Sequence, residues 1–171
     1  MYIKLFASIS AIFFLFCSCN APSERWKAAE KIIQHHSNEF RKSDSMMLFA
    51  VGEGSTRLEN AYKINIDYWV NRQVDIDEAR RIYFRALDRA VELLNESEGI
   101  RPYLTYYPAN ETNVHMMVAF SKSPGVRPDP GYVALVNIAK GRVFYDGYKD
   151  NAYYDLHSET IPEARQRIRE Y

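Results

Sequence analysis

The chain has 171 residues, of which 47% are hydrophobic and 26% are charged, a balance that is typical of one soluble globular domain and excludes a disordered chain. Lys and Arg together number 22, as do Asp and Glu, and this neutrality argues against a dedicated nucleic-acid binder, which is usually basic. Both cysteines, Cys17 and Cys19, lie near the N-terminus. Residues 20–171 therefore cannot form an internal disulfide, a cysteine nucleophile or a zinc ribbon.

Residues 1–18 have the pattern of a bacterial signal peptide. Lys4 supplies a short positive start, and residues 5–17 form an apolar run that is broken only by two serines. A run of this length suits the hydrophobic region of a signal peptide and is shorter than the roughly 20 residues needed to cross a bilayer.

The stretch Phe16-Cys17-Ser18-Cys19 resembles the lipobox of bacterial lipoproteins, in which a small residue precedes the lipid-carrying cysteine. Ser18 fits that pattern, whereas Phe16 replaces the usual leucine and Cys17 is an unusual neighbour. The resemblance implies that Cys19 is the lipid attachment site and would label with palmitate. Acyl chains each contribute about 0.8 kcal/mol per buried CH₂, so two or three chains anchor a protein stably.

The resemblance also implies a place in the cell and a division of the chain. Residues 19–23 are the lipidated cysteine and a short tether, and residues 24–171 are a single globular domain in the bacterial cell envelope. Asn20 is not acidic, which favours the outer membrane in a Gram-negative organism. Two alternatives stay open: ordinary signal cleavage that releases a soluble periplasmic or secreted protein, and an uncleaved anchor.

The first half of the body predicts a helix, a hairpin and a second helix. Ser23 is the expected N-cap of a helix that runs to about Lys42. Residues 45–51 form a short apolar run, and in residues 58–70 apolar and polar side chains alternate at most positions, so we expect these two strands to pair. Asp75, with Glu78 three residues later, is the expected start of a long helix that ends near residue 96.

The second half predicts further strands and a short helix. Strands are expected over residues 114–121, 132–139 and 142–145, the last two joined by a Lys140-Gly141 turn, and a terminal helix begins at Thr160. This order predicts an α+β fold with a mostly antiparallel sheet of about five strands and with the helices packed on one face. The residues between about 146 and 159 are expected to be a loop.

No catalytic or cofactor motif stands out. Gly52-x-Gly54 is followed by a strand and not by the helix that a phosphate-binding loop requires, so it is expected to be a turn. Asp155, His157 and Glu159 are the only close cluster of acids with a histidine, and in an extended loop they would be able to converge on a divalent cation. A solvated loop is the simpler interpretation, and we expect no metal and no cofactor.

Arginines recur every four residues along the long helix, at Arg81, Arg85 and Arg89. This stripe would be able to contact anionic lipid headgroups or cell-wall polymers. Acidic residues lie three or four positions away on the same helix, however, so we expect a solvated face of ion pairs.

Aromatic residues supply the candidate contact sites. Trp69 lies among hydrophilic residues on the polar face of its strand, so it is either covered by another segment or an exposed anchor for a partner. Tyrosine suits contact surfaces because it is rigid, apolar on its face and polar at its tip. The clustered tyrosines are therefore candidate contact residues as well, although they would equally pin loops over the sheet: Tyr103, Tyr106, Tyr107, Tyr148, Tyr153 and Tyr154.

These observations favour a lipoprotein of the envelope that binds or supports another component and is not an enzyme. The expected partners are the membrane, through the lipid anchor, and an envelope protein or glycan, but not a nucleic acid. The alternative is an enzyme that acts on the cell wall or on glycans. A carboxyl group with a raised pKa in a cleft lined by aromatic residues would favour the enzyme, whereas an open sheet face would favour the binding module.

Overall fold

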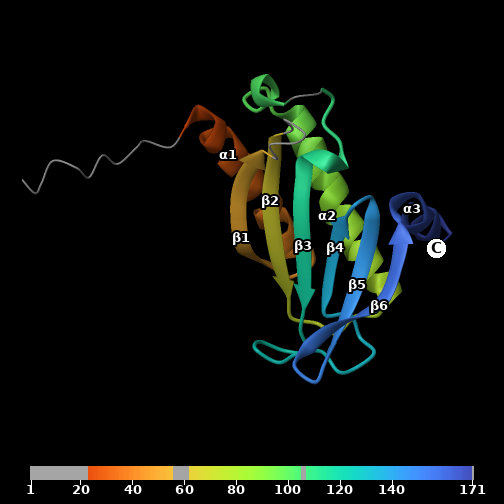
Figure 1. The fold of residues 1–171 in the computed structure, drawn as a ribbon. Helices are drawn as coiled ribbons and strands as arrows, with labels where there is room; N and C mark the ends of the chain where they lie inside the picture. The colour runs from red at the N-terminus through yellow and green to blue at the C-terminus, as the bar shows by residue number, and fades with distance from the viewer. Residues whose placement is uncertain (1–22, 56–61, 105–106, 171) are drawn as a thin grey trace, which may run out of the picture.

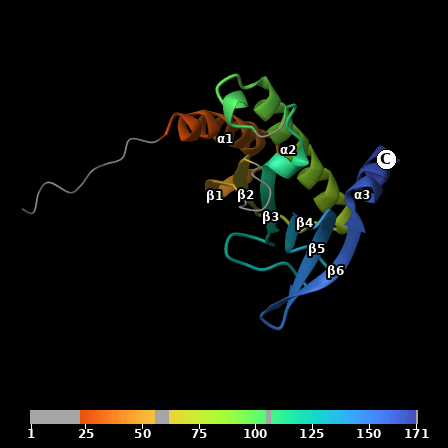
Figure 2. The same cartoon turned by 45° about the horizontal axis from the view of Figure 1, so that its top comes forward.

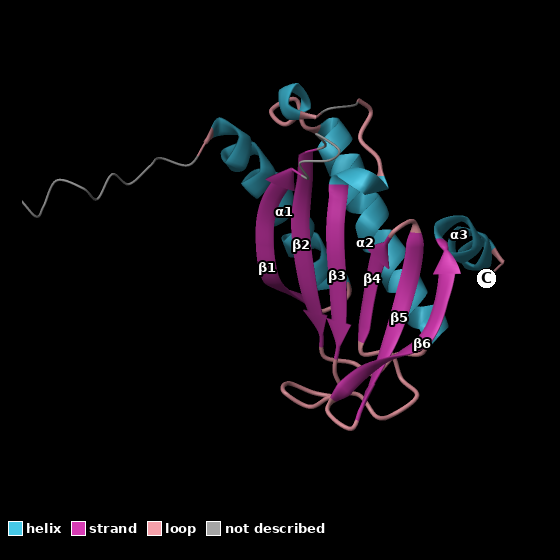
Figure 3. Cartoon of the chain, viewed as in Figure 1, coloured by secondary structure: helices cyan, strands magenta, loops and turns pink. Residues whose placement is uncertain are grey.

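In the computed structural model, which describes residues 23–55, 62–104 and 107–170, one sheet carries all the helices on a single face (Figures 1 and 2). Figure 3 separates the two layers by colour. The helices are α1 (Glu24–Ser43), α2 (Ile76–Glu96) and α3 (Ile161–Arg169), with short 3₁₀ turns at Arg101–Tyr103 and Glu111–Asn113. The strands are β1 (Met46–Ser55), β2 (Tyr62–Val70), β3 (Val114–Phe120), β4 (Leu135–Ala139), β5 (Arg142–Lys149) and β6 (Ala152–Thr160).

The six strands are arranged in the order in which they occur in the chain, β1-β2-β3-β4-β5-β6. All neighbouring strands are antiparallel except β2 and β3. Parallel neighbours cannot be joined by a tight turn, and here the connection is the long helix α2, which crosses behind the sheet (Figure 1). The expected α+β fold with segregated helices is confirmed.

Local signals in the sequence set the ends of the helices as predicted. The Ser23 side chain accepts a hydrogen bond from the Trp26 amide at 3.1 Å at the start of α1. The Asp75 carboxylate accepts one from the Glu78 amide at 2.8 Å at the start of α2. Thr160 caps α3 in the same way, in a reciprocal capping box with the residue three positions on. These caps satisfy amide groups that have no partner within their helices.

The prediction of a loop before α3 is wrong, because the chain forms a sixth strand there. Strand β5 continues to Lys149, and Asp150 and Asn151 make a two-residue turn with φ angles of 52° and 62° into β6. Positive φ at both central residues is the hairpin geometry that matches the twist of the flanking strands. An Asp-Asn pair adopts it without glycine, so the usual sequence signal of a hairpin is missing here.

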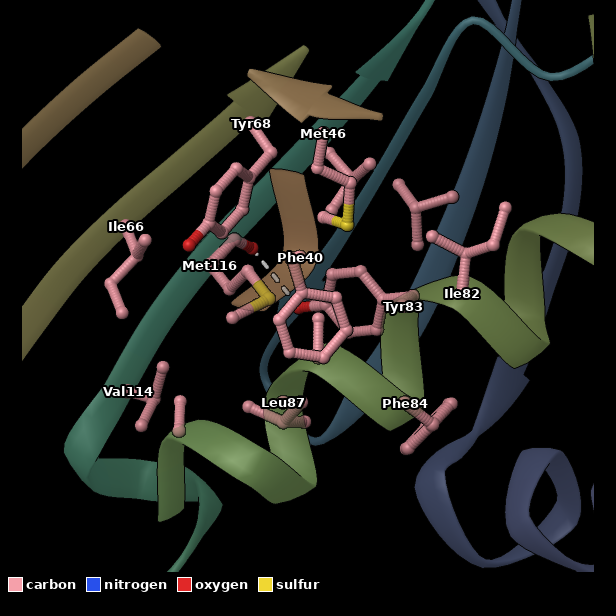
Figure 4. Packing of buried hydrophobic residues seen from close by; sticks show 14 of the residues in the cluster. Phe40, Met46, Ile66, Tyr68, Ile82, Tyr83, Phe84, Leu87, Val114 and Met116 are labelled. Atoms are coloured by element: carbon pink, nitrogen blue, oxygen red, sulfur yellow. Dashed lines mark hydrogen bonds between the residues drawn. The ribbon is translucent and has the colours of Figure 1, made fainter. Parts of the chain in front are cut away.

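The core lies between the sheet and the helices (Figure 4). The inward side chains of β2, namely Ile64, Ile66, Tyr68 and Val70, are at most 1% exposed, as their alternation predicts. The predicted inner stripe of α2 packs against them, and Phe84 of this helix is also buried. The hydroxyl group of Tyr83 donates to the backbone carbonyl of Met116 at 3.0 Å, so its burial leaves no polar atom without a partner.

His36 of α1 is completely buried in this core. Its Nε2 lies 2.8 Å from the carbonyl oxygen of Ala86, which can only accept, so Nε2 carries the proton. Its Nδ1 accepts a hydrogen bond from the hydroxyl group of Tyr68 at 2.5 Å. Both ring nitrogens are satisfied in the neutral form, and burial lowers the pKa of His36 from 6.5 to about 4.

This histidine predicts a loss of stability in mild acid. The unfolded chain binds a proton on His36 as the pH falls below 6.5, but the folded protein does so only near pH 4. The free energy of unfolding should therefore fall by up to about 3 kcal/mol between pH 7 and pH 4. Urea titrations over this range should show a weaker pH dependence in His36→Gln. His35→Gln, at an exposed neighbouring position, should behave as wild type, and an unchanged slope in His36→Gln would contradict the assignment.

A buried ion pair, between Arg80 and Glu159, joins α2 to the end of β6. The guanidinium group of Arg80 donates from Nε to Oε1 of Glu159 at 2.7 Å, and both side chains are less than 5% exposed. Tyr145 donates to the same oxygen at 2.8 Å, and Asp77 pairs with Arg80 from the preceding turn of α2. Burial alone would raise the pKa of Glu159, but the hydrogen bonds from Arg80 and Tyr145 hold it below its ordinary value.

Removing the cation should therefore be far more costly than removing its neighbour. Arg80→Met leaves the Glu159 carboxylate buried without its main partner, and the free energy of unfolding should fall by about 3–5 kcal/mol. Arg81→Met is the matched control, because Arg81 is the adjacent residue of the same helix and is exposed, and it should cost less than about 0.5 kcal/mol. Equal losses for the two variants in denaturant titrations would show that the buried pair does not hold β6 in place.

Candidate binding surface on the open face of the sheet

The helices cover one face of the sheet and leave the other face open (Figure 2). Side chains that alternate with the core residues of the strands point to this open face. The strand registers place the open-face residues of five strands in one row, which we call the Trp69 row: Met47, Trp69, Ala119, Leu135 and Asp146. Trp69 thus points away from the core, as the alternation of its strand predicts. The row is apolar from β1 to β4 and ends at a carboxylate on β5.

Phe49 extends the apolar part of this row. The pairing of β1 with β2 is irregular between Leu48 and Ala50, so Phe49 is an extra residue in a β-bulge. Its ring lies edge-on to the indole of Trp69, with 6.3 Å between the ring centres. Phe49 is 57% exposed and Met47 is 46% exposed, which leaves large apolar side chains in contact with solvent. Hydrophobic side chains clustered in this way on a surface are typical of contact sites.

Trp69 itself is half-buried and held in a fixed orientation. Its indole Nε1 donates to the hydroxyl group of Ser121 at 2.8 Å, and Ser121 in turn donates to the side chain of Asn71 at 2.8 Å. Phe49 and Ser121 are therefore the contacts that the structure gives to this indole. A rigid aromatic side chain with its polar atom already satisfied loses little entropy when a partner packs on it.

Two carboxyl groups on the open face have raised pKa values, which raises the question of an enzyme. Burial raises the pKa of Asp67, whose Oδ1 is buried without a hydrogen bond. Burial and the nearby charge of Asp155 raise the pKa of Asp146. Asp67 on β2 and Asp146 on β5 are, however, separated by three strand spacings, or about 14 Å. Paired carboxylates that cleave glycosides lie at most about 9.5 Å apart, so these two do not form such a pair.

The tyrosines do not gather around one concavity. Tyr103 and Tyr107 follow α2 at one end of the molecule and are 39% and 53% exposed. The guanidinium group of Arg101 lies 4.6 Å from the ring centre of Tyr107 and donates to its hydroxyl group at 3.2 Å. Tyr106 and the proposed lipid site Cys19 lie outside the described residues.

The other tyrosines belong to the β5–β6 hairpin at the opposite end (Figure 1). The guanidinium group of Arg127 lies 4.6 Å from the ring centre of Tyr148 and 5.5 Å from that of Tyr153. The hydroxyl group of Tyr154 accepts a hydrogen bond from the amide of Gly131 at 3.0 Å. These three tyrosines therefore fix the long β3–β4 connection to the hairpin, which was one of the two roles expected for them.

The acid and histidine cluster of the C-terminal region is divided between the two faces. Asp155 is opposite Asp146 in the register of β5 and β6 and so lies on the open face. His157 and Glu159 point to the helix side, where the histidine ring stacks on Tyr145. Among the residues that the structure describes, no group of three or more His, Cys, Asp and Glu side chains is placed to hold a metal ion.

Two of the three arginines of the α2 stripe are in ion pairs, but only Arg89 pairs with an acidic residue of its own helix, as was expected for the stripe. Arg89 pairs with Glu39 at 3.0 Å and with Glu92 at 3.1 Å, and Arg85 pairs with Asp44. The three arginines, with Glu39 and Glu92, line a groove of about 630 Å³ between the helices, on the side of the molecule opposite the open face. Arg85 and Arg89 are thus occupied by internal partners, whereas Arg81 has no ion pair among the described residues.

The residues that sequence analysis missed are Met47 and Phe49. Their run was assigned to a strand, but an apolar run gives no indication of which side chains remain exposed. Comparison with protein-family models, curated proteins and solved structures found no match to the chain. Within residues 23–55, 62–104 and 107–170, no helix is long and apolar enough to span a membrane.

Proposed function

We propose that the protein is a bacterial envelope lipoprotein whose domain is a non-enzymatic binding module. Its binding surface is the apolar part of the Trp69 row together with Phe49. The observation that carries this proposal is the exposure of Phe49 and Met47 beside an indole that is held in place by Ser121. The partner is another envelope component, a protein or a glycan, that packs on these aromatic and thioether side chains.

The chemistry of the surface supports a contact site. Exposed apolar side chains gain free energy when a partner removes them from water, by about 25 cal/mol for each Å² buried. Anchors of binding energy are commonly aromatic and surrounded by polar residues that define the orientation of the partner. Asp67 and Asn65 continue β2 on the same face beyond Trp69 and supply such polar groups.

The proposal predicts that binding and stability can be separated at this surface. Phe49→Ala should change the free energy of unfolding by less than about 1 kcal/mol, because the ring is 57% exposed. The same variant should weaken binding by about tenfold or more if the ring is an anchor. The measurement is quantitative capture of envelope proteins and co-sedimentation with purified cell-wall sacculi, each with wild type and variant.

Tyr103→Ala is the control, because Tyr103 is a 39% exposed aromatic residue at the other end of the molecule, and it should bind as wild type. Binding that survives both Phe49→Ala and Trp69→Ala would exclude this surface. Release of soluble fragments from the sacculi by the wild-type protein would instead favour the alternative, a glycan-directed enzyme.

The anchor is tested separately. Cys19→Ala removes the thiol that would carry the lipid, so the protein should move from the membrane fraction to the soluble fraction or accumulate as a precursor. The wild-type protein should also incorporate radiolabelled palmitate. A wild-type protein that is soluble and unlabelled would show that the lipoprotein assignment is wrong, whatever the outcome for the binding surface.

A further inference from the structure

Strand β1 lies at the edge of the sheet and pairs only with β2 among the described residues. One side of this ten-residue strand therefore presents backbone N–H and C=O groups that no described strand pairs. Natural proteins usually protect such an edge with charges, prolines or covering segments, since it is a template for pairing with another chain. Residues 46–52 contain no charged residue and no proline.

The side chains of β1 are exposed on both faces of the sheet. Met47 and Phe49 lie on the open face. Leu48 and Val51, which are opposite Tyr68 and Ile66 in the register, lie on the helix side and are still 41% and 44% exposed. A strand added to this edge would therefore bury apolar side chains on both faces at once.

The other edge of the sheet differs. Strand β6 carries Asp155, His157 and Glu159, and its pairing with β5 is irregular between Tyr145 and Asp146. Charged side chains protect an edge against a further strand, and β1, which also has a bulge, has no charged residue over residues 46–52. Only one of the two edges is therefore suited to accept a partner strand.

We infer that β1 pairs antiparallel with β1 of a second copy of this chain and that the protein is a two-fold symmetric dimer with a continuous sheet. Pairing of uncharged residues 46–52 with themselves brings no like charges together, whereas pairing with β6 would set Asp155 against apolar residues. In an antiparallel pair, opposite residues share a face, so Leu48 and Val51 meet apolar residues of the other copy. Because β6 is protected, the assembly closes at two copies and does not grow.

The test uses residues of the helix side, which are not part of the Trp69 row. The full chain is extracted in a density-matched detergent, and its mass is measured by sedimentation equilibrium over a range of protein concentrations. Wild type should be a dimer, and Val51→Lys should raise the dimer dissociation constant by about tenfold or more. Val126→Lys is the matched control, because Val126 is 47% exposed in the β3–β4 connection and the substitution is the same.

Hydrogen exchange on the wild-type protein gives a second reading that does not depend on the folding of a variant. Amides of residues 46–52 should become more protected as the protein concentration rises through the dimer dissociation constant. A monomer at all concentrations, a Val51→Lys variant as dimeric as wild type, or a mass that keeps rising beyond two copies would each overturn the inference. Protection of β1 that requires an added envelope extract would also overturn it, in favour of a partner strand from another protein.

Discussion

The ion pair between Arg80 and Glu159 fixes the position of everything that follows β5. Glu159 is the second-to-last residue of β6, and Thr160 directly after it caps α3, so the pair places the last strand and the last helix against α2. Neither charge would be tolerated in this interior alone, since an unpaired buried charge costs several kcal/mol. Helix α2 supplies the buried cation and strand β6 supplies the buried anion. Each charge can be buried only because the other one is there, so the packing of the helix layer and that of the last strand depend on each other.

How much of the structure could be predicted from the sequence depends on how far apart in the chain the interacting residues are. Helix caps and the alternation of β2 involve residues within a few positions, and these predictions were confirmed. Arg80 was not predicted to be buried, because its partner is 79 residues away in the sequence and nothing local distinguishes it from Arg81. The same applies to Trp69: alternation predicted the face on which it lies, but Phe49 reaches it through a bulge and Ser121 through a crossover, and neither leaves a local signal.

The two faces of the sheet differ in what covers them. On the helix side, the buried His36 and Tyr83 each have hydrogen-bond partners, and the cluster around Glu159 holds its charges in ion pairs, although Oε2 of Glu159 has no hydrogen bond. On the open face, one buried oxygen of Asp67 likewise lacks a hydrogen bond, and the large apolar side chains of Met47 and Phe49 meet water. What the open face would offer a partner is therefore exposed apolar area and not an excess of unsatisfied polar groups.

The length of α1 has a consequence for where that face is presented. This helix has 20 residues, or about 30 Å, and runs from the beginning of the described chain to the end of the sheet at which β1 starts. Met47 and Trp69 lie at this far end. The length of α1 thus separates the first described residues from the Trp69 row by up to about 30 Å. If the chain is anchored at Cys19 as proposed, the row lies at the end of α1 away from the tether.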